Sequence, residues 1–402
     1  MSGPELEGRS PGCPPRSPGS QPALATLGSM RVIIVGAGVL GTMHAWQAVS
    51  RGHEVVHLER EAAARGASVR NFGLVWVSGR STGPELDTAL RARELWEEIG
   101  KEVPDLGFRA SGSLTPVTTD HEHAVAREAL DAPEAPLRDL HFLDPDQVRE
   151  VNPALRGEML GALWCRRDAQ VEPRTAQRAL QDTLARSGRY TLLTEREIRE
   201  LPRTGTVRDD HGDLHEGDHV VLCTGAQLGG LVRELAPDLP VRRVRLQMMQ
   251  TAPLETTLTT SVADADSFRY YPAYRGPGLD TLNTHQPQPE TARDHAMQLL
   301  MVQRADGSLT IGDTHEYEHP FAFDTDEAPY DHLTGVAEGL LGRPLPSIRR
   351  RWAGVYTQCT DPGTLVHRAP VADGAWLITG PGGRGMTCSP AIAETTANDL
   401  GW

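Results

Sequence analysis

The stretch MRVIIVGAGVLGTMHA, residues 30–45, joins a short apolar run to a turn that contains three glycines. The run RVIIVG predicts a buried parallel strand, and the following GVLGTMHAWQAVSRG predicts a helix that ends at Gly52. A second apolar run, HEVVHLE at residues 53–59, predicts another strand. The order strand, turn, helix, strand makes residue 31 the expected beginning of the folded chain.

The turn carries the pattern G-x-G-x-x-G at Gly36, Gly38 and Gly41. Gly36 permits a tight turn, Gly38 lets a pyrophosphate approach backbone N–H groups at the helix start, and Gly41 allows close packing of helix on strand. Glu59 ends the second strand, 18 residues after Gly41, where a carboxylate accepts hydrogen bonds from ribose hydroxyls. A purely structural turn is the alternative. The agreement of strand, helix, spacing and acid favours a dinucleotide site, without distinguishing NAD from FAD.

Composition narrows the class of protein. The 402 residues exceed the ~250–300 at which one core stops growing, so two domains are expected. A net charge of −14 argues against nucleic acid as a partner. The five cysteines are scattered without a C-x-x-C pair, which favours reduced thiols in the cytoplasm over disulfides or a metal site. The chain has no uninterrupted apolar run of ~18 residues, so no membrane span is expected. Residues 1–29, rich in Pro, Gly and Ser, predict a disordered leader.

Later segments favour FAD. DHVVLCTGA at residues 218–226 predicts a strand that runs into a Thr-Gly-Ala turn. WLITGPGGRGMTCSPAIAETTANDL at residues 376–400 predicts a strand, a glycine-rich turn and a helix, so that the N–H groups of residues 383–387 can face an anion. A second strand-coupled G-x-G-x-x-G is absent from the middle of the chain, which argues against an added NADPH domain. A glycine turn near each end suits one FAD held by both ends of the chain.

At this point the sequence resembles the D-amino-acid oxidase superfamily of flavoproteins, which includes glycine and sarcosine oxidases. The resemblance covers residues 30–402 and rests on VGAGVLGTMHA, LERE, GASVRNFGLVW, DAQVEPR, VVLCTGA, GSLTIGDTHE, RWAGVYTQCTD and GPGGRGMTCSP. RGASVRNFGLVW followed by SGR further resembles a bacterial subgroup associated with aminophosphonate metabolism.

The resemblance implies an α/β (α+β) architecture in which a Rossmann-like FAD-binding domain is interwoven with an antiparallel-sheet substrate domain. The FAD-binding domain is expected from residues 30–110, 165–240 and 350–402. The substrate domain is expected from residues 85–165 and 241–350, with overlapping borders.

The resemblance also implies site residues. The candidate catalytic residues are Arg70, Tyr356 and Met386. Arg70 would stabilise anionic reduced flavin or bind an anionic substrate head; the alternative is a surface arginine in a loop. Residues 385–387 would place N–H groups where reduced-flavin charge develops. The candidate cofactor-binding residues are Gly36, Gly38, Val39, Leu40, Gly41, Glu59, Arg60, Ser68, Arg70, Asn71, Gly73, Val171, Thr224, Gly225, Gly383, Arg384, Gly385, Met386 and Thr387.

Three positions depart from the family pattern. Tyr356 stands where related amino-acid oxidases carry a carboxylate-binding arginine, which makes an ordinary α-amino acid substrate doubtful. Thr310 stands where sarcosine oxidases carry a lysine linked to oxygen activation. Gly354 replaces the cysteine that anchors flavin covalently, so non-covalent FAD is expected.

Other arginines are available to replace the missing clamp. Strand alternation places Arg243 and Arg245 on one face and Arg242 on the other. The segment SFRYYPAYR adds further Arg and Tyr donors suited to a phosphonate dianion. The candidate substrate-binding residues are Arg243, Arg245, Arg269, Tyr271 and Tyr356.

The sequence therefore predicts FAD-dependent oxidation of a small primary or secondary amine, such as 2-aminoethylphosphonate or its N-methyl form. Hydride would pass to flavin N5, water would hydrolyse the imine, and O2 would reoxidise the flavin to give H2O2. The alternatives are an oxidase of the glycine, sarcosine or D-amino-acid type, a flavin amine dehydrogenase with another acceptor, and a non-catalytic flavoprotein. The sequence does not indicate an oligomeric state.

Overall fold

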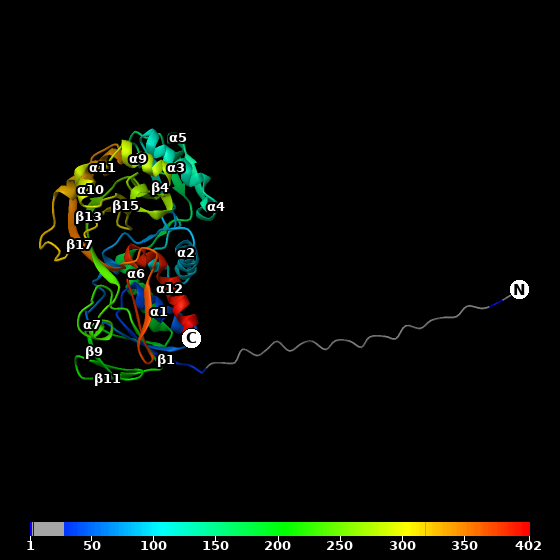
Figure 1. Cartoon of the computed structure of the whole chain (residues 1–402), viewed down its shortest axis with the longest axis vertical. Helices are drawn as coiled ribbons and strands as arrows, with labels where there is room; N and C mark the ends of the chain where they lie inside the picture. Colours follow the sequence, from blue (N-terminus) through cyan, green and yellow to red (C-terminus); the bar gives the residue numbers. More distant parts are fainter. Residues whose placement is uncertain (2, 4–27, 318) are drawn as a thin grey trace.

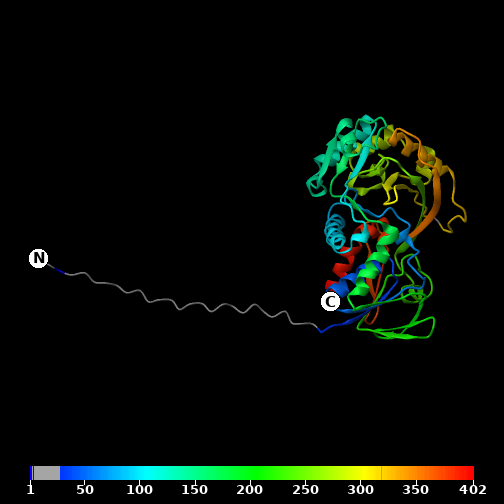
Figure 2. The same cartoon turned by 180° about the vertical axis from the view of Figure 1, so that it is seen from behind.

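The computed structural model describes residues 1, 3, 28–317 and 319–402. The predicted disordered leader, residues 1–29, lies almost wholly outside the described residues. Two parts lie one above the other along the long axis of the molecule, as Figure 1 shows from one side and Figure 2 from the other. Each part is built around a sheet of its own.

The first part contains a six-stranded sheet in the order β18-β19-β12-β1-β2-β8. Its strands are parallel except for the edge strand β18, which pairs antiparallel with β19. The strands are β1 (Arg31–Val35), β2 (Glu54–Leu58), β8 (Tyr190–Leu193), β12 (His219–Leu222), β18 (His367–Ala372) and β19 (Ala375–Thr379). Central strands such as β1 are apolar along nearly their whole length because both faces of the sheet are covered.

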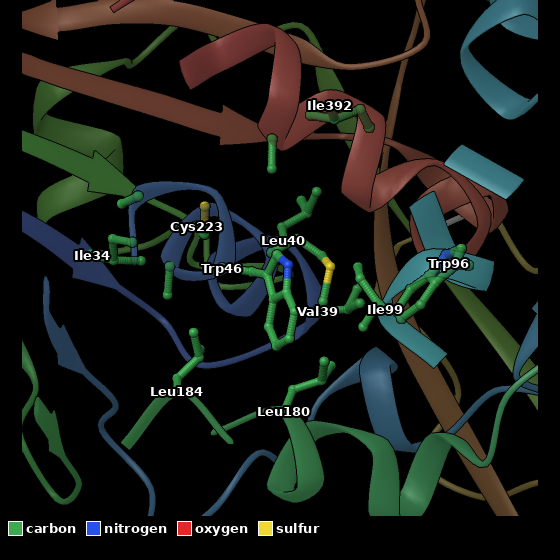
Figure 3. Packing of buried hydrophobic residues seen from close by; sticks show 14 of the residues in the cluster. Ile34, Val39, Leu40, Trp46, Trp96, Ile99, Leu180, Leu184, Cys223 and Ile392 are labelled. Atoms are coloured by element: carbon green, nitrogen blue, oxygen red, sulfur yellow. The ribbon is translucent and has the colours of Figure 1, made fainter. Parts of the chain in front are cut away.

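Four helices pack beside this sheet: α1 (Val39–Ser50), α2 (Pro84–Glu102), α6 (Pro173–Arg186) and α12 (Gly385–Asp399). Figure 3 shows the core that they share, in which Trp46 of α1 lies among Leu40, Leu180 and Leu184. A small antiparallel sheet flanks the six strands and comprises β9 (Ile198–Arg203), β10 (Thr206–Asp209) and β11 (Leu214–Glu216), with α7 (Leu231–Leu235) close to β9.

The second part contains an eight-stranded sheet in the order β17-β13-β16-β15-β14-β4-β6-β5. All neighbours are antiparallel except β14 and β4. The strands are β4 (Ser113–Val117), β5 (Leu140–Leu143), β6 (Gly161–Cys165), β13 (Val241–Pro253), β14 (Ser261–Ala263), β15 (Leu300–Gln303), β16 (Ser308–Gly312) and β17 (Ile348–Cys359). Its helices are α3 (Asp120–Asp131), α4 (Ala135–Arg138), α5 (Pro145–Val151), α8 (Ser267–Tyr270), α9 (Pro277–His285), α10 (Glu290–Asp294) and α11 (Ala328–Leu341).

Short elements complete the chain: the two-stranded pair β3 (Leu74–Val75) and β7 (Ala169–Gln170), and the 3-10 helices η1 (Ala67–Val69), η2 (Pro104–Leu106), η3 (Pro272–Tyr274) and η4 (Gly382–Arg384). Within the described ranges, no helix is long and apolar enough to cross a membrane.

The predicted strand–turn–helix–strand unit is confirmed as β1, α1 and β2, and the predicted C-terminal unit as β19, η4 and α12. The mixed α/β fold with an interleaved, largely antiparallel second sheet is also as predicted. The border expected at residue 350 falls inside β17, which pairs along its length with β13 of the eight-stranded sheet. Residues 348–359 therefore belong with the second part.

Candidate flavin and amine site

A cavity of about 1270 Å³ is lined by residues from both parts of the molecule. One end is lined by the strand ends of β1, β2 and β12 and by the first residues of α1 and α12. The other end is lined by residues 355–358 of β17 and by Arg269, Tyr270, Tyr271, Pro272, Arg275, Asp313, His315 and Tyr317. The volume exceeds the ~300–1,000 Å³ that small-ligand pockets usually have, which leaves space for a dinucleotide together with a small substrate.

The β1–α1 turn has the geometry that the glycine motif predicts. Gly36 has a φ of 97°, and a Cβ atom on it would lie 2.3 Å from the carbonyl oxygen of Cys223. A Cβ on Gly41 would lie 1.9 Å from the carbonyl oxygen of Gly36, so α1 can approach β1 only with glycine there. Gly38, Val39 and Leu40 line the cavity, whereas Gly41 acts behind it through packing.

Glu59 lies at the end of β2 and lines the same end of the cavity, beside Arg60. Its Oε2 accepts the N–H of Ala37 at 2.7 Å, and its Oε1 accepts the N–H of Glu61 at 3.0 Å. These bonds fix the carboxylate against the turn. Because an ionised carboxylate has about four acceptor positions, both oxygens keep acceptor capacity for ribose hydroxyls.

The loop at residues 67–73 closes over the start of α1. Ser68 Oγ accepts the N–H of Val39 at 2.8 Å. The side-chain amide of Asn71 donates to the carbonyls of Ala67 and Ser68 and accepts the N–H of Gly73. Asn71, which was predicted as a cofactor ligand, lines the cavity, and its amide holds the shape of this loop.

Arg70 is exposed at the rim of the cavity, and its Nη1 donates to the carbonyl of Ala353 at 2.9 Å. A Cβ on Gly354 would lie 3.4 Å from the Arg70 carbonyl oxygen. The loop therefore crosses directly over the part of β17 where the family's cysteine anchor would stand.

The glycine turn before α12 reaches the cavity from the opposite end of the chain. Gly383, Arg384, Gly385, Met386 and Thr387 all line it, and α12 begins without a side-chain cap from its N-cap residue. The Arg384 guanidinium donates to the carbonyls of Pro381 and Thr364 and pairs with Glu85 at 3.3 Å, so it supports the turn. Uncapped N–H groups at a helix start are a suitable partner for an anionic ligand.

Two anchors fix this turn. Thr387 Oγ1 accepts the N–H of Trp76 at 2.9 Å and donates to the carbonyl of Leu74. The indole N–H of Trp96 in α2 donates to the carbonyl of Met386 at 3.0 Å.

Thr224 and Gly225, directly after β12, line the cavity as well. Gly73 and Val171 are outside its lining, and the N–H of Val171 donates to the carbonyl of Gly73 at 2.8 Å. These two predicted cofactor residues support the loop from behind.

Three predicted substrate residues line the opposite end: Arg269, Tyr271 and Tyr356. The Tyr356 hydroxyl lies 3.7 Å from the position that a Cβ on Gly383 would take, so it lies beside the α12 turn. The Arg269 guanidinium pairs with Asp266 at 2.8 Å and also donates to Asn283 and to the carbonyl of Gln286. Arg269 is thus held by its own neighbours.

The positions of Arg243 and Arg245 correct the sequence expectation, because neither lines the cavity. Arg245 is buried and pairs with Glu316 at 2.6 Å, and it also donates to the carbonyls of Ala322 and Asp324. Arg243 lies over the ring of Phe321. Arg243 and Arg245 do share one strand face, but that face points toward Glu316 and residues 321–324 and away from the cavity.

Sequence reasoning missed a polar group at the same end: Asp313, Gln298 and His315 line the cavity with Tyr270 and Tyr317. Burial raises the pKa of Asp313 to about 8, although its own N–H and the Gln298 side chain act against that rise. Burial lowers the pKa of His315 to about 4, and its ring stacks on Tyr270 at 4.3 Å between centroids. The available signal was an aspartate directly after a strand in which Leu309 and Ile311 alternate with Ser308 and Thr310, in SLTIGD.

The residues present fit FAD. Two helix starts, the Glu59 carboxylate and the glycine turn suit the phosphates and ribose of a dinucleotide, and the cavity continues into a tyrosine-lined end. Met386 and Thr387 would adjoin the flavin ring system through the α12 turn. When bound, FAD supplies the acceptor for a hydride from carbon. Residues of this chain would bind and orient the substrate beside it.

The sequence matches the family model described as DAO, FAD dependent oxidoreductase, over residues 31–398. It is 23% identical over 392 residues to one chain of the opine oxidase of Rhizobium meliloti, covering 91% of this chain and 94% of that protein. It is 26% identical over 388 residues to glycine oxidase of Pseudomonas aeruginosa, covering 92% and 94%.

The crystal structure of glycine oxidase from Geobacillus kaustophilus is similar with a TM-score of 0.72 and 20% identity, covering 92% of this chain and 94% of that chain. That likeness confirms the fold. The family match confirms FAD as the cofactor and the resemblance to the D-amino-acid oxidase superfamily. Membership of the aminophosphonate subgroup stays a prediction.

Proposed function

The chain belongs to the DAO family of FAD-dependent oxidoreductases, and we propose that it oxidises a small primary or secondary amine to an imine that water hydrolyses. One observation carries this proposal: a single cavity joins the dinucleotide turn and Glu59 to an end lined by tyrosines and Asp313. A substrate at that end would lie next to the α12 turn. The relatives named glycine oxidase and opine oxidase agree with an amine or amino-acid substrate.

The test is anaerobic mixing of the purified yellow protein with a panel of amino acids, N-methylated amines and aminophosphonates. Bleaching of the flavin absorbance by at least one amine is the expected result. If no amine in the panel bleaches the flavin, the proposed oxidation is rejected in favour of a non-catalytic flavoprotein. Admission of oxygen then separates an oxidase, which forms H2O2 at the rate of amine consumption, from a dehydrogenase that needs another acceptor.

The finer part of the proposal is an aminophosphonate substrate. Tyr356 in place of the family's arginine supports it, as do the exposed Arg70 and Arg275 in the cavity lining. Losing a charged partner from a desolvated pair costs ~2–5 kcal/mol, so a clamp fitted to phosphonate predicts kcat/KM about thirtyfold above that for the matching carboxylate. The comparison is 2-aminoethylphosphonate and its N-methyl form against β-alanine, glycine and sarcosine at one oxygen concentration. Faster oxidation of glycine or sarcosine would reject the phosphonate.

We also propose a cytoplasmic location, which the free thiols of Cys165, Cys223, Cys359 and Cys388 support. Cell fractionation tests it, and recovery outside the cytoplasmic fraction would reject it.

A further inference from the structure

Two buried acceptor atoms without partners lie at the tyrosine-lined end of the cavity. Asp313 is 5% exposed and Gln298 is 2% exposed, and both line the cavity. Asp313 Oδ1 and Gln298 Oε1 have no hydrogen-bond partner among the described residues. Buried polar atoms are nearly always paired, so two unpaired acceptors in one cavity indicate a ligand that donates hydrogen bonds.

We propose that Asp313 and Gln298 form the site that receives the substrate's amino group, and that the site selects amines in the cationic ammonium form. Because a nitrogen without a lone pair cannot assist hydride loss from carbon, the bound ammonium passes one N–H proton to the ionised Asp313 carboxylate before the hydride leaves. This inference rests on the proposed amine oxidation and assigns its specificity to named residues. A secondary ammonium brings two N–H donors and a primary ammonium three, which matches two neighbouring acceptors. A neutral alcohol of the same shape brings one donor and no charge.

The aromatic side chains around Asp313 support a cationic occupant. Tyr270, Tyr271, Tyr317 and Tyr356 line this end, and the first two pack edge to face with centroids 5.0 Å apart. The negative face of an aromatic ring attracts a cation within ~6 Å of its centroid. An ammonium held by Asp313 would thus meet a carboxylate and ring faces together.

The charges on the elements around Asp313 also favour a cationic ligand. No ion pair involves Asp313 among residues 28–317 and 319–402. Arg269, the guanidinium on the neighbouring α8, is paired with Asp266. The Arg80 guanidinium lies 5.8 Å from the ring centroid of Tyr271 and donates from Nε to the carbonyl of Trp76. Once Asp313 ionises above its pKa of about 8, its negative charge is therefore available to a ligand.

The test measures binding, which is independent of turnover. tert-Butylammonium has no hydrogen on the carbon attached to nitrogen, so it binds without being oxidised, and tert-butanol has the same shape without charge. Both are titrated into the FAD-loaded enzyme at pH 9 while the flavin absorbance is followed. Asp313→Asn should weaken tert-butylammonium binding by at least about thirtyfold, because it removes the charged partner. Its Kd for tert-butanol should stay unchanged, which shows that the cavity is intact.

Asp264→Asn is the matched control. Asp264 is also a buried aspartate with an unpartnered Oδ1, and it is outside the cavity lining. Its substitution should leave the Kd for tert-butylammonium unchanged. Equal binding of tert-butylammonium by the wild type and Asp313→Asn, or an equal loss in Asp264→Asn, would overturn the assignment.

A second measurement needs no variant. Tetramethylammonium has a fixed charge, so any pH dependence of its Kd reports the protein. Asp313, with a pKa near 8, becomes ionised as pH rises, so binding should be at least about tenfold tighter at pH 9 than at pH 6. The other facing groups do not titrate in this window: burial lowers the pKa of His315 to about 4 and raises the pKa values of the four tyrosines.

A Kd for tetramethylammonium that is constant from pH 6 to pH 9 would mean that the rings alone recognise the cation, and would overturn the role of Asp313. The two proposals fail separately. Flavin bleaching by amines without Asp313-dependent cation binding rejects this inference alone. Asp313-dependent cation binding in an enzyme that no amine reduces rejects the proposed oxidation alone.

Discussion

Asp168 is a buried carboxylate that ties together three segments next to the cavity. Its Oδ1 accepts the N–H groups of Val77 and Ser78 at 2.5 and 3.0 Å. Its Oδ2 accepts the hydroxyls of Ser78 and Ser113, each at 2.6 Å. Burial raises the pKa of Asp168, and these four donors act in the opposite direction. The charge is tolerated in the interior because its acceptor positions are filled.

Asp168→Ala should lower the free energy of unfolding of the FAD-loaded protein by ~3 kcal/mol or more, since it leaves several buried donors unpaired. Urea denaturation followed by tryptophan fluorescence measures the change. Asp146→Ala is the control: its side chain is 95% exposed, so a change within about 0.5 kcal/mol is expected. A loss as small as the control's would show that the four hydrogen bonds contribute little to stability.

Residues were predictable where one local pattern determines their role. Gly36, Gly41 and Glu59 follow from a strand, a helix and a spacing that can be read directly from the sequence. Arg245 was misplaced because its partner, Glu316, lies 71 positions away and reaches it only through the pairing around β13 and β16. Asp313 was missed for the same reason, since the tyrosines that surround it come from residues 270–271, 317 and 356.

Among the elements, the loop at residues 67–73 depends on an arginine from the other sheet. Arg304, just after β15, donates from Nη1 to the carbonyl of Phe72 at 2.8 Å and from Nη2 to that of Asn71 at 3.0 Å. Its Nε donates to Thr310 Oγ1 at 2.8 Å. Burial lowers the pKa of Arg304 to about 10, which leaves it charged at neutral pH. Thr310, which departs from the family's lysine, thus serves as an acceptor for this arginine.

Arg304→Met keeps much of the side-chain length and removes all three hydrogen bonds. We expect the loop to loosen over the start of α1 and the Kd for FAD to rise at least about tenfold, which corresponds to ~1.4 kcal/mol. Titration of the deflavinated protein with FAD measures this Kd. Arg293→Met, at a 62% exposed side chain paired with Asp294, should leave it unchanged. An unaltered Kd in Arg304→Met would show that the loop keeps its shape without Arg304.

The units β1–α1–β2 and β19–α12 could be predicted because burial imposes a pattern on the local sequence. A helix with one buried face has regularly spaced apolar residues, and a fully buried strand is a continuous apolar run. The order of the strands could not. β13 pairs with β17 about a hundred residues later, and β14 lies beside β4. Such pairings are decided by the packing of the complete sheet, so the interleaved architecture came from the family resemblance alone.

In the whole molecule, the cavity is built from both sheets and from both ends of the chain, so a bound dinucleotide would join parts that are far apart in sequence. Residues of β1 and α12 reach its one end, while β17 and residues 313–317 reach the other. A ligand that binds only the folded arrangement stabilises it by RT ln(1 + [L]/Kd), about 2.7 kcal/mol at a hundredfold excess over Kd. FAD should therefore stabilise the molecule as a whole, by an amount that rises with the logarithm of its free concentration.

The last prediction is that this FAD is held without a covalent bond. Gly354 offers no side chain, and burial raises the pKa of Cys223, the thiol in the cavity lining, which keeps it in the unreactive thiol form. Acid precipitation should release the yellow colour into the supernatant, and the Tm of the deflavinated protein should climb with added FAD. Cys223→Ser should behave as the wild type in both measurements. Flavin retained on the denatured chain, or a Tm that does not change with added FAD, would contradict reversible binding of FAD between the two sheets.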